Sequence, residues 1–319
     1  MKRWVTELGL FSVVIIWGIN YTINKFGLVQ LSPAEFNEFR FLGTAPVLFL
    51  LTFLFERSLR ISRRDIVRLL GVSVLGVSVY NTMFSVAVKY TSVTNLSLLI
   101  AMSPIFSSLF AALMKQEKFT WKMQIGSAVA FVGAALVLLA GHLTSAHYPH
   151  ALAGDLVGLF DSVIWGIYPV LTAPLFKKYT PLRVTSWSMA IGAVSLVLYN
   201  GIVVRPVFPV ALWNVTWMSL LYSILFVTAY GMVVWYLGVE RIGTTKAMVY
   251  MYLVPAAAVS FAAIANHERV YAGQVAGGVL ILLGLSYIKG LHTFAWLHMR
   301  KTLGKKVPLA PNEARQQGQ

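Results

Sequence analysis

Residues 8–26 read LGLFSVVIIWGINYTINKF, an apolar run that carries no charge before Lys25. A bilayer core about 30 Å thick is crossed by about 20 such residues in a helix. The run therefore predicts a transmembrane helix. Met1, Lys2 and Arg3 precede it as in a secretory signal, but no small-residue cleavage site ends it, so we expect the helix to be retained.

The composition extends this prediction to the whole chain. The 319 residues are 58% hydrophobic and 12% charged, with a mean hydropathy of +0.72. A soluble domain carries roughly 25% charged residues, so lipid must cover much of this surface. The net charge of +15 would otherwise favour nucleic acid. Because the basic residues sit in short clusters between apolar runs, we read them as a topology signal and expect no nucleic-acid partner.

Ten apolar runs are long enough to span the membrane, which predicts an all-α integral membrane protein. They lie near Leu8–Phe26, Ala34–Phe55, Ile66–Val88, Val93–Met114, Trp121–Gly141, Leu152–Phe176, Leu182–Val204, Trp213–Leu237, Ala247–Ala265 and Val270–Ile288. With the N-terminus inside, 21 of the 26 Lys and Arg residues fall on the cytoplasmic side and four outside. Lys and Arg resist translocation, so both termini are predicted to be cytoplasmic.

A weak internal repeat divides these spans into two sets of five. Trp17-Gly18-Ile19 recurs as Trp165-Gly166-Ile167 at a shift of 148, and after a slip of three Pro104 matches Pro255, Gly126 matches Gly277 and Gly133 matches Gly284. Five is odd, so the second copy must enter from the opposite face, as in transporters built on inverted repeats. We expect repeats at 1–145 and 146–290, and a disordered, basic cytoplasmic tail at 291–319.

The residues that carry the repeat also carry a resemblance. Trp17-Gly18, Arg40, Pro104 and Glu117 before a Gly-rich fifth helix resemble the EamA-type, ten-helix branch of the drug/metabolite transporter superfamily. The second copy repeats the pattern with Trp165-Gly166, Pro255, Glu268 and Gly277. The resemblance covers about residues 8–290 and implies a bacterial inner-membrane exporter of amino acids or other metabolites, without identifying the solute.

Two charged residues within the spans require an explanation because ionisable groups in a bilayer are costly. Asp161 lies about nine residues into the sixth span. It is either a proton-coupling carboxylate, a partner for a cationic substrate group, or a structural Asp satisfied by neighbours. Arg40 lies in the second span near Glu35 and Glu38 and either forms a fixed ion pair or binds a substrate carboxylate.

A substrate pocket is predicted from amides and aromatic rings placed in mid-span. Such a lining suits an organic solute with an apolar body and a few polar groups, although each ring could equally serve helix packing. The candidate substrate-binding residues are Asn20, Arg40, Tyr80, Asn81, Trp165, Tyr168 and Tyr230. Pro104 and Pro255 interrupt matching helices and are candidate gating hinges, or else static kinks.

Other classes of function are poorly supported. The chain has no cysteine, and no histidine falls within a predicted span, so an enzyme with a nucleophile or a metal centre is disfavoured. His142, His147 and His150 could be imagined as a zinc site, but we expect neither metal nor cofactor. We expect a transporter of a small molecule in a bacterial inner membrane, exporting by proton-linked alternating access. Importers, facilitative permeases, receptors and structural proteins stay as alternatives, and a homodimer is left open.

Overall fold

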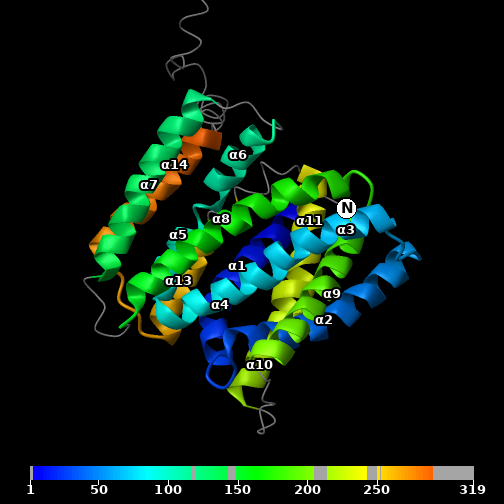
Figure 1. Cartoon of the computed structure of the whole chain (residues 1–319). Helices are drawn as coiled ribbons and strands as arrows, with labels where there is room; N and C mark the ends of the chain where they lie inside the picture. The colour runs from blue at the N-terminus through cyan, green and yellow to red at the C-terminus, as the bar shows by residue number, and fades with distance from the viewer. Residues whose placement is uncertain are drawn as a thin grey trace, which may run out of the picture.

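The protein, described from a computed structural model, is a bundle of helices (Figure 1). The structure describes residues 3–115, 120–142, 149–204, 214–242, 250–251 and 253–289. All regular secondary structure in those ranges is helical. The α-helices are α1 (Arg3–Gly27), α2 (Pro33–Glu56), α3 (Arg63–Ser73), α4 (Tyr80–Tyr90), α5 (Val93–Ile100), α6 (Ser103–Leu113), α7 (Trp121–His142), α8 (Ala151–Phe176), α9 (Pro181–Tyr199), α10 (Val215–Tyr222), α11 (Gly231–Ile242), α13 (Val254–Ala265) and α14 (Ala272–Lys289).

Three π-helical segments continue these helices without a loop. They are η1 (Val74–Val79) between α3 and α4, η3 (Asn200–Val204) after α9, and η4 (Ser223–Tyr230) between α10 and α11. Because a π-turn contains more residues than an α-turn, it shifts which side chains share a face. The segments η1 and η4 lie in the middle of their spans, so they decide what faces the centre of the bundle.

Within the described ranges, seven helices are long and apolar enough to cross a membrane. Three shorter apolar helices, Gln124–Val137, Val254–Ala265 and Ala272–Gly284, fall where the fifth, ninth and tenth spans were predicted. The all-helical membrane fold is therefore confirmed, whereas ten crossings stay a prediction. The predicted tail at 291–319 lies outside the described residues.

Local sequence explains how two of these helices begin. Ser32 caps α2, where its hydroxyl accepts a hydrogen bond from the Glu35 N–H at 3.3 Å and Pro33 occupies the first turn. Thr180 caps α9 in the same way, accepting from the Arg183 N–H at 3.3 Å. Such caps satisfy N–H groups that lack an intrahelical partner.

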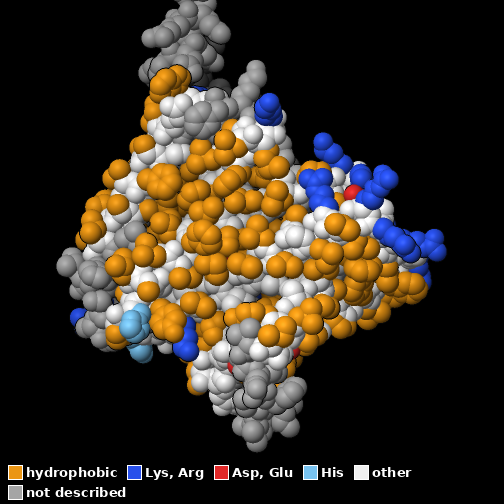
Figure 2. All heavy atoms as spheres, viewed as in Figure 1, with side chains coloured by type: hydrophobic (Ala, Val, Ile, Leu, Met, Phe, Trp, Pro, Cys, Tyr) orange, Lys and Arg blue, Asp and Glu red, His pale blue; other side chains and the backbone are white. Residues whose placement is uncertain are grey.

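The distribution of side chains is that of a protein solvated by lipid. Large apolar residues are exposed in the middle of helices, among them Phe160 of α8 and Val194 of α9, 56% and 58% exposed, and Figure 2 shows a broad hydrophobic surface. Lys and Arg gather at the end where α3 begins, beside the N-terminus (Figure 2). Polar side chains such as Asn37 and Thr44 are instead buried inside.

Candidate functional site

A cavity lies at the centre of the bundle, and six of the seven predicted binding residues line it. It encloses about 730 Å³ of empty space including its opening. Residues from both halves of the chain form its wall. The predicted residues found there are Asn20, Arg40, Tyr80, Asn81, Trp165 and Tyr168.

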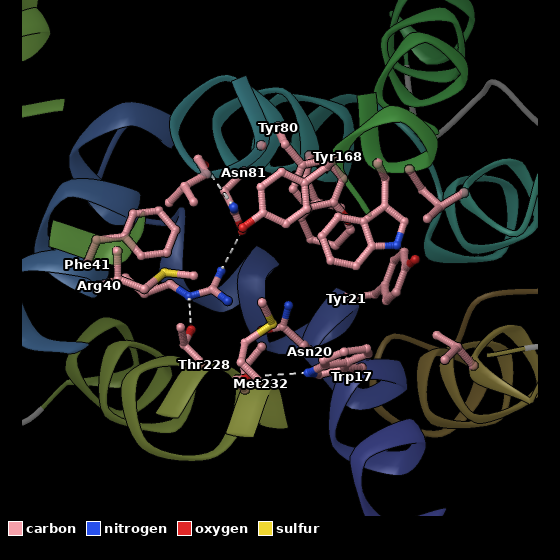
Figure 3. A pocket seen from close by; sticks show the side chains of 18 of the residues that line it. Trp17, Asn20, Tyr21, Arg40, Phe41, Tyr80, Asn81, Tyr168, Thr228 and Met232 are labelled. Atoms are coloured by element: carbon pink, nitrogen blue, oxygen red, sulfur yellow. Dashed lines mark hydrogen bonds between the residues drawn. The ribbon is translucent and has the colours of Figure 1, made fainter. Parts of the chain in front are cut away.

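Arg40 provides a positive charge in the cavity wall (Figure 3). Its Nε donates to Thr228 Oγ1 at 2.9 Å and one terminal nitrogen donates to Asn81 Oδ1 at 3.2 Å. The side chain is buried. Within the ranges that the structure describes, no carboxylate lies within salt-bridge distance of this guanidinium.

The fixed ion pair that the sequence allowed for Arg40 is therefore not formed. Glu38 faces elsewhere and accepts a hydrogen bond from Asn200, while Glu35 accepts from the Ser32 backbone N–H in the cap of α2. A buried guanidinium held by neutral groups keeps its charge uncompensated and has donors to spare. This arrangement suits an anionic ligand group.

Stacked rings form the opposite part of the wall. Tyr80 stacks on Trp165 with ring centroids 4.7 Å apart, and Trp165 stacks on Tyr168 at 6.0 Å. Tyr21 closes this side and meets Phe84 edge to face at 4.9 Å. In Figure 3, Arg40 and Tyr21 lie at opposite sides of the cavity.

Glycine at position 76 makes room for one of these rings. A Cβ atom there would overlap the ring of Tyr168. Gly76 belongs to η1, so the π-helical segment brings bare backbone against the cavity wall. This glycine does not stand out in the sequence, because only its packing against Tyr168 reveals its role.

Tyr230 is the predicted binding residue that the structure does not bring to the cavity. It is 40% exposed, and its hydroxyl lies 2.8 Å from Ser12 Oγ. Tyr230 was predicted as one of the rings placed in mid-span, but residues 223–230 form the π-helix η4. The wider turns direct Thr228 to the cavity instead, where it meets Arg40.

Several other residues that line the cavity were not predicted from the sequence. Three are methionines, Met189, Met232 and Met251, and the remainder include Trp17 and Val254. Methionine fills irregular space and adapts to different contacts. Its apolar character made it look like ordinary membrane-helix sequence, so no signal distinguished it beforehand.

Asp161 lies beside the cavity rather than in its lining. It is fully buried, and neither carboxylate oxygen has a hydrogen-bond partner. On α8 it precedes Trp165 by four residues and Tyr168 by seven, which places it on their face of the helix. Tyr21 and Tyr80 are near enough to interact with it electrostatically. The structural alternative, an Asp satisfied by hydroxyl or amide neighbours, is therefore not what the structure shows.

The two hinge candidates start helices instead of bending them. Pro104 lies in the first turn of α6 after a break at residues 101–102, and Pro255 lies in the first turn of α13. A first-turn proline sacrifices no intrahelical hydrogen bond. The carbonyl of Ile100, just before the break, accepts from Ser103 Oγ at 2.5 Å. The helix thus breaks just before Pro104, and Pro255 starts α13, while a gating role for either proline stays a prediction.

No group of three or more His, Asp or Glu residues that could hold a metal occurs among the described residues. Of the histidines considered for zinc, His147 lies outside the described residues.

Comparison with known proteins adds an independent line of evidence. The sequence profile of the EamA-like transporter family matches the chain twice, at residues 4–139 and 152–289. The "Uncharacterized transporter YyaM" of Bacillus subtilis is 28% identical, covering 91% of this chain and 95% of that protein. A "Probable terminal-alkyne amino-acid exporter" of Streptantibioticus cattleyicolor is 30% identical, covering 76% of each.

A more distant relative and a solved structure agree with these matches. A "Probable amino-acid metabolite efflux pump" of Salmonella typhimurium is 25% identical over 86% of this chain and 91% of that protein. A crystal structure of a protein is similar with a TM-score of 0.64 and 18% identity, over 91% of this chain and 99% of the other. At that identity the likeness shows a shared fold.

Proposed function

The chain belongs to the EamA-like transporter family, and on that premise we propose that this membrane transporter exports small organic metabolites that carry a carboxylate. Amino acids and other amphipathic compounds are the leading class. The observation that carries the proposal is Arg40, a buried guanidinium in the cavity wall that no described carboxylate neutralises. Two relatives are named as an exporter and an efflux pump, which favours the outward direction.

The cavity suits both parts of such a solute. Arginine binds carboxylates through a planar fork of N–H donors, and Asn20 and Asn81 add amide groups to the same wall. The stacked rings of Tyr80, Trp165 and Tyr168 offer apolar faces to the body of the solute. Because their π-faces also attract cations, an ammonium group beside the carboxylate would be accommodated.

Proton coupling through Asp161 is the finer part of the proposal. A carboxylate buried without any hydrogen bond is strongly disfavoured in its charged form, so Asp161 holds a proton in this conformation. Its position one turn from Trp165 allows a change in the cavity to alter its hydration. We propose that it releases and rebinds this proton as the cavity opens to the two sides of the membrane.

We further propose ten crossings arranged as two inverted repeats, with alternating access between them. The family profile matches twice, as two copies require. Moreover, a Cβ at Gly133 of α7 would meet the carbonyl of Gly277 on α14, and a Cβ at Gly284 of α14 would meet the carbonyl of Gly126 on α7. Because Gly133 corresponds to Gly284 and Gly277 to Gly126, the second contact is the first with the two repeats exchanged, as a two-fold relation predicts.

The basic residues support an orientation with both termini in the cytoplasm. Five arginines, from Arg57 to Arg68, surround the start of α3 beside the N-terminus, at one end of the bundle. Lys and Arg mark the cytoplasmic side. Because relatives such as YyaM are bacterial, we propose a bacterial inner membrane as its location. The repeat boundaries at 1–145 and 146–290 belong to the same proposal.

Transport by inside-out vesicles tests the proposal. Vesicles containing the protein are supplied with radiolabelled amino acids, with and without an imposed proton gradient. Export predicts gradient-dependent accumulation of at least one amino acid. Accumulation only in right-side-out vesicles would identify an importer, gradient-independent equilibration a facilitative permease, and a lack of any specific flux would refute transport of this solute class.

A further inference from the structure

A second hollow adjoins the central cavity on the side away from Arg40. It holds about 470 Å³ of empty space including its openings. Five residues line both spaces and so form the partition between them: Tyr21, Ile100, Trp165, Met251 and Val254. Figure 3 shows Tyr21 at the edge of the central cavity opposite Arg40, so the hollow continues the cavity beyond its aromatic side.

The hollow lies at the helix discontinuity between α5 and α6. Ser97 lines it from α5, Ala101 from the break, and Ser103 and Ser107 from α6. Helix α8 contributes Gly166. A Cβ at Gly166 would meet the carbonyl oxygen of Ser103 at 2.6 Å, so α8 packs tightly on the first turn of α6. Pro255, at the start of α13, completes the wall.

The chemistry of this lining selects an uncharged occupant. Among the described residues that line it there is no carboxylate and no basic side chain. The hydroxyl of Ser97 donates to the Thr94 carbonyl within α5 at 3.0 Å, and that of Ser103 donates across the break to the Ile100 carbonyl at 2.5 Å, so both donors are engaged. A charged group would be costly there, whereas an apolar group would leave these two hydrogen bonds intact.

The partition is built from side chains that can move. Met251 is unbranched and adaptable, and the ring of Tyr21 can be displaced by rotation about the bonds of its side chain. We infer that the hollow is a subsite for the apolar tail of the transported solute, which passes the partition when its carboxylate is held at Arg40. This inference rests on the proposed function. It makes Ser107 and Met251 determinants of tail length, and solutes with long unbranched or aromatic tails the preferred cargo.

The test uses the purified full-length protein in nanodiscs and the variant Ser107→Leu, which fills the hollow without touching the central cavity. Ala112→Leu, five residues further along α6, adds the same side chain at a position that lines neither space. Competition binding is measured with alanine, norvaline, norleucine and 2-aminooctanoic acid. We expect Ser107→Leu to weaken 2-aminooctanoic acid at least tenfold and alanine less than twofold, and Ala112→Leu to match the unmodified protein.

A second probe separates this inference from the proposed function. Indole has no carboxylate, and its binding is measured by calorimetry in the same three proteins. If indole binding is lost in Ser107→Leu and in neither of the other two proteins, the subsite is supported. If at the same time no amino acid binds to any of the three, only the proposed function is refuted. Equal weakening of alanine and 2-aminooctanoic acid, or indole binding that is unchanged by Ser107→Leu, would overturn the inference.

Discussion

Replacing Arg40 with glutamine should selectively weaken solutes that carry a carboxylate. A guanidinium has five N–H donors, and the structure uses two of them, toward Thr228 and Asn81. The three that are left suffice for a two-pronged contact with a carboxylate. Glutamine keeps an amide that can still reach Asn81, so the helices should stay together while the charge is removed.

The size of the effect follows from that geometry. A hydrogen bond to a charged group contributes about 1.5–3 kcal/mol. Two such bonds, partly offset by the desolvation of the carboxylate, give about 2–4 kcal/mol, and each 1.4 kcal/mol is tenfold in affinity. The apparent affinity for a transported amino acid should therefore fall between about 30-fold and several hundred-fold.

The assay is competition binding in nanodiscs with each amino acid and its carboxamide, which lacks the negative charge. Arg40→Gln should affect the acid and leave the weaker binding of the amide nearly constant. Arg64→Gln, which removes an exposed charge at the end of the bundle, serves as the control and should resemble the unmodified protein. If acid and amide weaken equally in Arg40→Gln, the guanidinium has a structural role and the reasoning fails.

Three further predictions concern other parts of the molecule. Asp161→Asn should abolish proton-driven flux but preserve solute binding and thermal stability, since no hydrogen bond is lost; full gradient-driven flux in inside-out vesicles would contradict this. Gly76→Ala should press Tyr168 into the cavity and lower affinity about tenfold, whereas Gly71→Ala, with open space around it, should bind normally. Glu268→Ala should remove one partner of the partly buried Lys25 and lower the free energy of unfolding by about 3 kcal/mol. The melting temperature should therefore fall, whereas Lys178→Gln, which removes an exposed charge, should leave it unchanged.

Polar residues in mid-span were predictable from the sequence because their burial in a membrane is expensive. Asn20, Arg40 and Asn81 stood out against apolar neighbours, and the structure brings all three to one cavity. The cost of exposing such groups to lipid requires an interior location. Aromatic residues are less constrained, since they are as stable against lipid as inside, and Tyr230 shows this ambiguity.

The unpredicted features depend on backbone geometry that the residue types do not encode. The π-helix η4 turns Thr228 inward and Tyr230 outward, and no single residue in 223–230 announces it. The hydrogen-bond partners of Arg40 could not be predicted either, because Glu35 and Glu38 are close to it in sequence but bind other groups. Sequence proximity thus suggested an ion pair that helix packing does not form.

The proposed two-fold relation extends to packing residues but not to Arg40 and Asp161, the two charged residues discussed within the spans, and that contrast itself favours transport. Gly18 packs against α13 and its mate Gly166 against α6, at equivalent positions. The mates of Arg40 and Asp161 are instead Ser188 and Val13, both buried without charge. Rocking between two equivalent shapes needs a symmetric backbone, whereas one solute at the pseudo-axis needs only one guanidinium to meet its carboxylate. A second buried charge at the position of Ser188 or Val13 would add the cost of desolvation without a ligand to offset it. Symmetry should therefore be kept at the packing glycines and lost at Arg40 and Asp161, as it is here.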